Sequence, residues 1–368
     1  MYLVPSAWET ANRSFLGPEG FIELTCYIPE LDETLVYKKG DLMSFTHQNT
    51  GSLVSGELPK NHIKFSLDNS DNKWTPGAPR GLERFLSERL KITLRYGFRL
   101  SKGIHWIPGG VFYLSEWRTS PNGLEATFAA RDLLEYMIDT PYRGVISGTL
   151  YDVATRAISL AKLPDDAVVR ISEDLKNYPV NIEDYDGTES VAEILQKCAN
   201  AAGCVMYQNR RGVFLIEKLD YEDTEYTIPL SMSYSYPEIE LSKALKNVSV
   251  SYGTDSTLLY ESGETGETQT VKNEFIQSEE QATMVAEWVV ENLHSRKTIS
   301  GESRGDPIID LFDVVNVENK YGTIVGVVIT DLTYRFNGAF KAEYKGYVRG
   351  SGVSTVVYSG EVFAGEVN

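Results

Sequence analysis

Residues 110–118 read GVFYLSEWR, and three residues later the chain continues with NGLEATF at 122–128. A second stretch has the same layout, with GVVITDLTYR at 326–335 and NGAFKAEY at 337–344. Each begins with a Gly-Val strand and passes through an Asn-Gly turn into an alternating return strand. Asn-Gly favours a two-residue hairpin because a type I′ turn needs positive φ at both central residues. We therefore predict structural hairpin turns at Asn122, Gly123, Asn337 and Gly338.

The repeat predicts two related β domains in one chain. Any two Asn-Gly hairpins share this local pattern, but each of these hairpins closes a β-rich section of the sequence. In the second return strand, Phe340, Ala342 and Tyr344 alternate with charged residues. One face of that strand is then apolar and the other charged, as in a barrel wall with one wet face.

The remaining sequence divides by its periodicity. Short alternating runs at 21–28, 90–96 and 111–114 predict antiparallel strands, and residues 82–86 fit one short helix. Thr149 is an N-cap candidate before an apolar helical stripe at 150–161, and Ser190 with Glu193 has the spacing of a capping box. Residues 204–216 read as a hairpin, and 261–268 as an exposed loop.

Strands return at 247–252, 314–317, 324–333 and 340–348, interrupted by a helix that starts at a predicted Ser278/Gln281 capping box. We expect a mainly β protein with an α+β insertion. Its four segments are a first antiparallel β-barrel domain at 1–145, a small α+β module at 146–222, a second barrel at 223–350 and a C-terminal extension at 351–368.

The composition narrows the class of protein. The chain has 368 residues, of which 42% are hydrophobic, and its net charge is −17, from 35 Lys and Arg against 52 Asp and Glu. This content is sufficient for buried cores, while the acidity argues against a surface that grips nucleic-acid phosphates. Three scattered cysteines predict neither disulfides nor zinc. No signal peptide or run of 18 apolar residues is present, so we expect a soluble protein made in a cytoplasm.

Two motifs invite a chemical reading. Residues 301–305 (GESRG) match a serine nucleophile elbow, but Asp306-Pro307 follows at once and opposes the required helix, so a loop before a strand is the better interpretation. Asp184, Asp186, Gly187 and Glu193 partly match a calcium loop, whose first ligand position is occupied by Ile182. A turn and a helix cap explain the same residues without a metal.

Other chemistry has weaker support. The four histidines are scattered, and no phosphate-binding glycine loop is present. Acidic residues that are neighbours in sequence seldom face each other across a cleft as glycosidase carboxylates do. We therefore predict no catalytic residues, no cofactor-binding residues and no metal ligands, and we expect that the protein is not an enzyme.

The order of elements resembles that of bacteriophage tail hub proteins, the baseplate hub or the N-terminal hub module of tail-tip proteins. The strand at 247–252, the helix at 278–293 and the run from RGDP at 304–307 into DLFDVV at 310–315 resemble the second hub barrel. Gly40-Asp41, WIPGGV at 106–111 and ARDLL at 130–134 are similar to the first. Residues 149–216 resemble the α+β insertion of that family.

The resemblance implies a structural virion protein. Hub proteins of this kind form homotrimers, in which two barrels per chain match the six-fold tail tube to a three-fold tail tip. The ring encloses a channel for the tape measure protein and DNA, and an acidic wall would let DNA pass without specific binding. Implied partners are the tail tube or distal tail protein ring, the tape measure protein and spike or fibre proteins. The implied location is the virion tail, after assembly in the host cytoplasm.

Residues 353–368 are too short for the endopeptidase or lysozyme module that some tail-tip relatives carry, so a separate protein is expected to supply the spike or cell-wall enzyme. Two alternatives stay open at this point. One is a tail-borne cell-wall or polysaccharide hydrolase with dispersed carboxylates. The other is a host-receptor-binding adhesin that uses tyrosine-rich loops such as 232–237.

Overall fold

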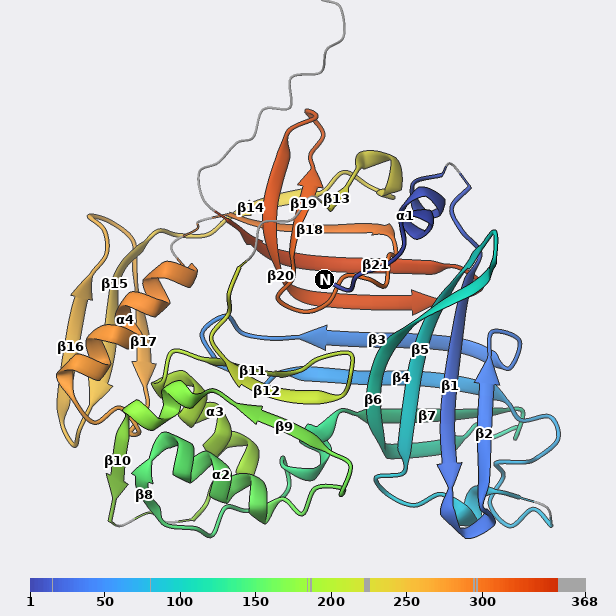
Figure 1. The fold of residues 1–368 in the computed structure, drawn as a ribbon, viewed down its shortest axis with the longest axis horizontal. Coiled ribbons are helices and arrows are strands. Elements are labelled where there is room, and N and C mark those ends of the chain that lie inside the picture. The colour runs from blue at the N-terminus through green and yellow to red at the C-terminus, as the bar shows by residue number, and fades with distance from the viewer. Residues whose placement is uncertain are drawn as a thin grey trace, which may run out of the picture.

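A computed structural model describes residues 1–14, 16–79, 81–183, 185, 187–221, 226–293, 295 and 297–349. The expected C-terminal extension, 351–368, lies outside these residues. The fold is mainly β, as predicted, and one mixed sheet of 13 strands dominates it (Figure 1). The order along this sheet is β14-β18-β21-β20-β3-β4-β7-β6-β5-β1-β2, with β19 and β13 attached beside β20.

The first β section follows the short helix α1 (Ser6–Arg13). Its strands form by alternation of buried and exposed residues, most regularly in β7, where every second side chain is buried. The predicted helix near 82–86 is a single 3-10 turn, Glu83–Phe85. The strands are β1 (Gly20–Ile28), β2 (Glu33–Lys38), β3 (Leu42–Thr50), β4 (Lys60–Asp68), β5 (Lys91–Leu100), β6 (Gly103–Thr119) and β7 (Glu125–Arg131).

The middle section contains two helices and small sheets. Thr149 caps α2 and Ser190 caps α3, and both caps are reciprocal capping boxes, with Asp152 and Glu193 as the third helical residues. The predicted hairpin is β11 and β12, and β9 pairs in parallel with β12. The elements are β8 (Ile146–Thr149), α2 (Leu150–Leu160), β9 (Val168–Ile171), β10 (Pro179–Ile182), α3 (Val191–Ala201), β11 (Val205–Gln208) and β12 (Val213–Glu217).

The last section returns to β structure. Residues 301–305 lie at the end of a strand, β18, and the turn into Asp306, not in a loop before a strand, because β18 is paired by β14 on one side and β21 on the other. The elements are β13 (Thr227–Ile228), β14 (Glu238–Leu241), β15 (Leu245–Tyr252), β16 (Ser256–Glu261), β17 (Glu267–Lys272), α4 (Glu279–Leu293), β18 (Lys297–Arg304), β19 (Val314–Glu318), β20 (Ile324–Phe336) and β21 (Phe340–Val348).

The two β sections repeat one strand order. Strands β3-β4-β7-β6 of the first correspond to β14-β18-β21-β20 of the second. Both long hairpins carry a β-bulge in the outgoing strand, at Ser115 in β6 and at Thr330 in β20. The Ser115 hydroxyl donates to the carbonyl of Ala129 at 3.1 Å, and the Thr330 hydroxyl donates to that of Lys345 at 3.4 Å. The Gly-Val pairs at 110–111 and 326–327 suggest one alignment of β6 with β20. Matching the bulge residues Ser115 and Thr330 gives an alignment that differs from it by one residue.

The hairpin turns differ from the expected type I′. Asn122 and Gly123 lie between β6 and β7, and Asn337 and Gly338 lie between β20 and β21. The two glycines have φ of +73° and +83°, but neither asparagine has a positive φ. Both loops are longer than the two residues that a type I′ hairpin requires, and loop length selects the turn type.

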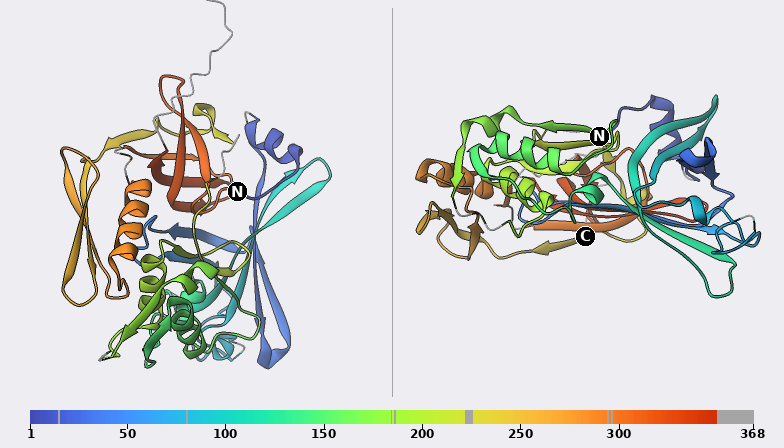
Figure 2. Two further views of the ribbon diagram at one scale, coloured as in Figure 1. Left: turned by 60° about the vertical axis from the view of Figure 1, so that its left-hand side comes forward. Right: turned by 90° about the horizontal axis from the view of Figure 1, so that it is seen from below.

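The hydrophobic residues form two large clusters that do not follow chain order. One combines both β sections, with Leu24, Phe112, Ile299 and Tyr344 among its buried residues. The other joins the α+β section to α4 and to the separate sheet β16-β15-β17. Figure 2 shows this small sheet and α4 beside the α+β section. Residues 245–293 thus pack mainly on the α+β section.

Candidate assembly site

One end of the large sheet is the short strand β14, which pairs with β18 alone. All four of its residues are exposed. Ile239 and Leu241 are 45% and 68% exposed, and Tyr234 and Tyr236, just before the strand, are 59% and 66% exposed. An unpaired strand edge with apolar side chains is a template for another strand. This edge, residues 238–241, is called the β14 edge.

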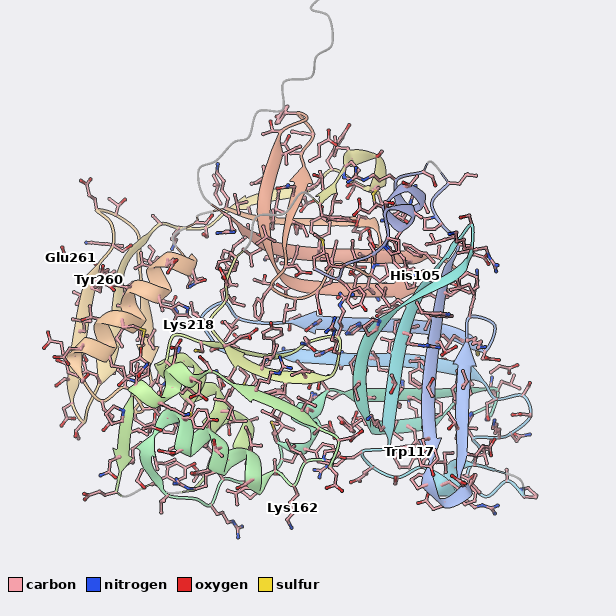
Figure 3. The ribbon with its side chains drawn as sticks, viewed as in Figure 1. His105, Trp117, Lys162, Lys218, Tyr260 and Glu261 are labelled. Carbon is pink, nitrogen blue, oxygen red and sulfur yellow. The ribbon has the colours of Figure 1, made fainter. Side chains whose placement is uncertain are left out.

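A second unpaired edge lies at the end of β6. Strand β5 pairs with β6 only as far as Tyr113, so within the described residues nothing pairs with residues 116–119 on the side away from β7. Trp117, labelled in Figure 3, is 36% exposed there. Arg118 points to the polar face and has no ion pair in the described part of the chain. Residues 116–119 are called the β6 edge.

The equivalent part of β20 is not open. There, residues 331–336 pair antiparallel with β3, and this contact joins the two β sections into one sheet. Figure 1 shows the strands stacked from β14 at the top through β18, β21, β20, β3 and β4 to β7 at the bottom. The two open edges therefore lie at opposite ends of the same stack.

The polar face of this stack mixes both signs of charge. In the second section its charges pair across strands: the Nζ of Lys341 lies 2.8 Å from Glu302, Arg335 binds Glu343 through two nitrogens, and Lys345 lies 3.7 Å from Glu240. In the first section the outward-facing charged residues are Lys60, Lys64, Arg118 and Arg131 with Asp68, Glu116 and Glu125. This face of the stack is therefore not acidic, because its basic and acidic side chains are about equally numerous.

The loop at 306–313 ties all sections together. Asp306 is buried and accepts hydrogen bonds from Trp8 Nε1 (3.0 Å), Asn12 Nδ2 (2.6 Å) and the Tyr226 hydroxyl (2.8 Å). Burial nevertheless raises the pKa of Asp306. The Tyr334 hydroxyl donates to the carbonyls of Asp306 and Ile309. Strand β20, helix α1 and the segment before β13 thus converge on one loop.

Arg210 enters the same loop from the hairpin β11–β12. Its Nε donates to Asp310 Oδ2 at 3.1 Å, and its terminal nitrogens donate to the carbonyls of Pro307 and Ile309. The side chains of Arg210 and Asp310 are only 10% and 19% exposed. Burial alone would raise the pKa of Asp310, but the charge and hydrogen bond of Arg210, together with the hydrogen bond from the Leu311 N–H, hold that pKa below its ordinary value. This ion pair fixes the α+β section against the β sections.

Asp132 marks a second contact between these sections. It is fully buried, and one carboxyl oxygen accepts from the backbone N–H of Leu134 at 3.1 Å. The other oxygen has no hydrogen-bond partner in the described structure, and burial raises the pKa of Asp132 to about 7. Beside it, Gln208 of β11 accepts from Leu133 N–H and donates to the carbonyl of Val111.

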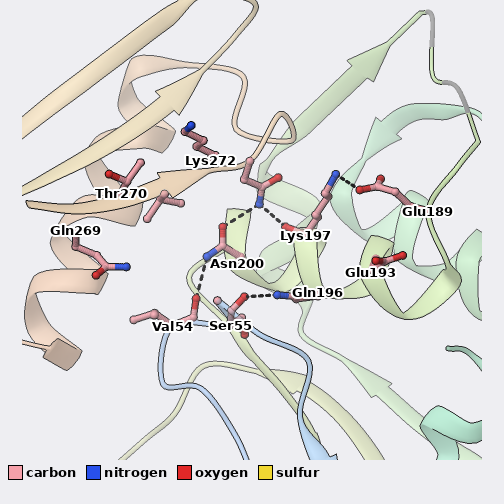
Figure 4. Close-up of a pocket in the computed structure, with 13 residues that line it drawn as sticks. Val54, Ser55, Glu189, Glu193, Gln196, Lys197, Asn200, Gln269, Thr270 and Lys272 are labelled. Atoms are coloured by element: carbon pink, nitrogen blue, oxygen red, sulfur yellow. Dashed lines mark hydrogen bonds and ion pairs between the residues drawn. The ribbon is translucent and has the colours of Figure 1, made fainter.

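A polar cleft of about 360 Å³ lies where the β3–β4 loop, α3 and β17 meet (Figure 4). Asn200 links the three, because its Nδ2 donates to the carbonyl of Val54 at 2.9 Å and its Oδ1 accepts from Asn273 Nδ2 at 2.9 Å. Lys197 forms ion pairs with Glu189 and Glu274. The named groups satisfy one another, as in a joint between sections.

The histidines and the residues of the partial calcium-loop match do not form a common site in the described structure. His47 is buried between the Tyr96 hydroxyl and Asn61, and burial lowers its pKa to about 4, so it is neutral. Asp184, Asp186 and His294 lie outside the described residues, while Glu193 serves as a helix cap. Among the described residues there is no group of three His, Cys, Asp or Glu side chains that could hold a metal ion. No described helix is long and apolar enough to cross a membrane.

Comparison with known proteins gives matches in structure alone. The sequence matches no protein-family model, and no curated protein sequence matches it. Three solved tail proteins share the fold. The tail protein of Neisseria meningitidis MC58 superposes with a TM-score of 0.63 at 12% identity, covering 90% of this chain and 97% of that one.

The other two come from prophages. The 43 kDa tail protein of prophage MuSo2 from Shewanella oneidensis has a TM-score of 0.57 at 13% identity, with 90% and 98% coverage. The prophage tail protein gp18 of Listeria monocytogenes EGD-e has a TM-score of 0.56 at 13% identity, with 91% and 96% coverage. The chain thus has the fold of phage tail proteins over nearly its whole length, which confirms the predicted fold class and, for the fold, the resemblance.

Proposed function

We propose that this chain is a structural hub protein of a bacteriophage tail or baseplate, without enzymatic activity. Three copies form a homotrimer in which six β sections, two per chain, make a ring. The ring joins the six-fold tail tube to the three-fold tail tip. The observation that carries this proposal is the repeated strand order within one sheet, since two equivalent sections per chain are what a three-fold to six-fold match requires.

The segments keep the roles expected from the sequence. Residues 1–145 supply the first barrel domain, 146–222 the α+β module and 223–350 the second barrel domain, whose residues 245–293 pack on the α+β module. Residues 351–368 are the C-terminal extension. The hairpin turns at Asn122, Gly123, Asn337 and Gly338 close equivalent walls. The tube or distal tail ring, the tape measure protein and a spike or fibre protein contact the ring in the virion, which assembles in the host cytoplasm.

The ring encloses the channel for the tape measure protein and DNA. If the polar face of the strand stack lines it, DNA meets a wall of mixed charge in which most charges of the second section are already paired. Paired charges offer few free cations for counterion release, so DNA passes without specific binding.

Equilibrium sedimentation of the purified chain, with negative-stain electron microscopy, tests the proposal. We expect a species of three chains and ring-shaped particles. A monomer at every concentration up to 100 µM, roughly where weak specific contacts still form, would contradict the trimer. Zymography on host cell walls is the accompanying assay, and clearing that a single Asp or Glu substitution abolishes would contradict the structural role.

A further inference from the structure

We infer that the β6 edge of one copy pairs with the β14 edge of the next, in the same register in which β20 pairs with β3 inside the chain. The inference rests on the proposed ring and adds its contact residues. Strand β20 corresponds to β6, and β3 corresponds to β14. The contact that joins the two sections within a chain therefore has an unfilled counterpart between chains.

The register follows from the two bulges. Because Ser115 corresponds to Thr330, Trp117 takes the place of Leu332 and Arg118 that of Thr333. On the other side, β7 corresponds to β21, which sets Ile63 of β4 equivalent to Ile299 of β18. Because β3 pairs with β4 and β14 pairs with β18, this equivalence also aligns β14 with β3. The resulting equivalences are His47 with Ile239, Gln48 with Glu240 and Asn49 with Leu241.

Within the chain, Leu332 lies opposite Asn49, Thr333 opposite Gln48 and Tyr334 opposite His47. Transferred to the open edges, this register makes three new pairs, which are Trp117 with Leu241, Arg118 with Glu240 and Thr119 with Ile239.

The chemistry of these pairs is complementary. Trp117 and Leu241, both exposed in the single chain, fall opposite each other on the apolar face, and an aromatic–aliphatic cross-strand pair stabilises a sheet. Arg118, which lacks an acidic partner in the described residues, falls opposite Glu240 on the polar face. Strand pairing alone fixes this register. The match of Trp117 with Leu241 and of Arg118 with Glu240 is therefore independent support for it.

A second copy is the occupant that this geometry selects. The two edges lie at opposite ends of one strand stack, so a single chain cannot join them (Figure 1). A head-to-tail contact between different surfaces closes into a ring when the rotation permits. Every junction in that ring would then have the β20–β3 geometry, alternately within and between chains.

Cross-linking tests the register directly. The variant Thr119→Cys/Ile239→Cys, oxidised and run on a non-reducing denaturing gel, should give a band of three linked chains. The native cysteines are buried and do not interfere. The matched control is Thr119→Cys/Leu259→Cys, in which Leu259 is even more exposed than Ile239 but lies on β16, and it should stay a single chain.

Charge reversal gives the second measurement. Arg118→Glu should weaken association by at least about tenfold, as like charges facing across an interface do, and Arg118→Glu/Glu240→Arg should recover most of it. Glu302→Arg, on the same polar face but on the internal strand β18, which already has a partner strand on each side, should leave association unchanged. A wild-type monomer would overturn the proposed function itself. A wild-type trimer that neither cross-links at 119 and 239 nor responds to Arg118→Glu would overturn this register and leave the hub proposal standing.

Discussion

Arg210 and Asp310, 100 residues apart in sequence, form an ion pair that lies mostly out of solvent at the meeting point of the three sections. Neither residue is in the first β section, yet Asn49 of β3 also donates to Asp310, at 3.4 Å. The Asp310 carboxylate, in the last β section, thus accepts hydrogen bonds from the first β section and from the α+β section.

Removing Arg210 should loosen this junction. Arg210→Ala leaves Asp310 charged and poorly compensated, and the expected loss in the free energy of unfolding is about 3–5 kcal/mol. Urea denaturation followed by far-UV circular dichroism measures it. The double variant Arg210→Ala/Asp310→Ala should lose less than the single one, because no lone charge remains buried. An equal or larger loss in the double variant would show that the pair is not coupled.

Asp132 should make stability depend on pH. The folded state keeps the Asp132 proton up to about pH 7, whereas the unfolded chain releases it near the ordinary value of 3.8. Between these pH values the unfolded state binds fewer protons, so the free energy of unfolding falls as pH rises. Asp132→Asn removes this contribution and should be more stable than the wild type by about 1–2 kcal/mol at pH 8, with no difference near pH 4. A constant difference from pH 4 to pH 8 would contradict the assignment.

Gly346 should tolerate no side chain. A Cβ at this position would lie 2.1 Å from the carbonyl oxygen of Val328, inside the β20–β21 hairpin. Gly346→Ala is expected to cost more than about 2 kcal/mol, because the strands must separate to admit it. The equivalent position in the first section is Ala130, which already carries a methyl group. Differential scanning calorimetry of Gly346→Ala and of Ala130→Gly compares the two, and a Gly346→Ala protein as stable as the wild type would contradict the close approach.

Asn200 should be required at the joint between the β3–β4 loop and β17. Asn200→Leu keeps the side-chain size but leaves the Val54 carbonyl and the Asn273 amide without this partner, at a cost of about 2–4 kcal/mol. Gln196→Leu, in the preceding turn of the same helix, removes one bond to Ser55 and should cost less. Thermal unfolding of both variants ranks them, and the reverse order would contradict the central role of Asn200.

The sequence was most informative where structure depends on local pattern. Capping boxes at Thr149 and Ser190 and the alternation of β7 are set by neighbouring residues, and the corresponding elements were predictable. The Ser278 box is only half formed, because Gln281 turns its side chain to Gln277 N–H and to the carbonyl of Ala201. That contact comes from α3, which no local pattern reveals.

The assembly site was not predictable from the sequence for the same reason. Arg210 and Asp310 meet only because distant segments of the chain pack together. The β6 and β14 edges can be recognised as unpaired only once the pairings of β5 with β6 and of β14 with β18 are known. Trp117 lies within the repeated stretch that suggested two related domains, but nothing in that stretch shows that it would be exposed. Ser115 and Thr330 establish which residues of β6 and β20 are equivalent, but only the strand pairing shows that they form bulges.

The pairing of β3 with β20 also bears on how the chain is made. The partner of β3 is β20, which follows roughly 280 residues later in the chain. At 5–20 residues per second, this separation corresponds to roughly 15–60 s of translation. During that interval the β3 edge is exposed on every nascent chain, and the β14 edge of a finished neighbour has an equivalent position and strand order. Chains emerging side by side on one polysome can therefore exchange strands, so the yield of correctly closed protein should depend on how densely ribosomes load the message.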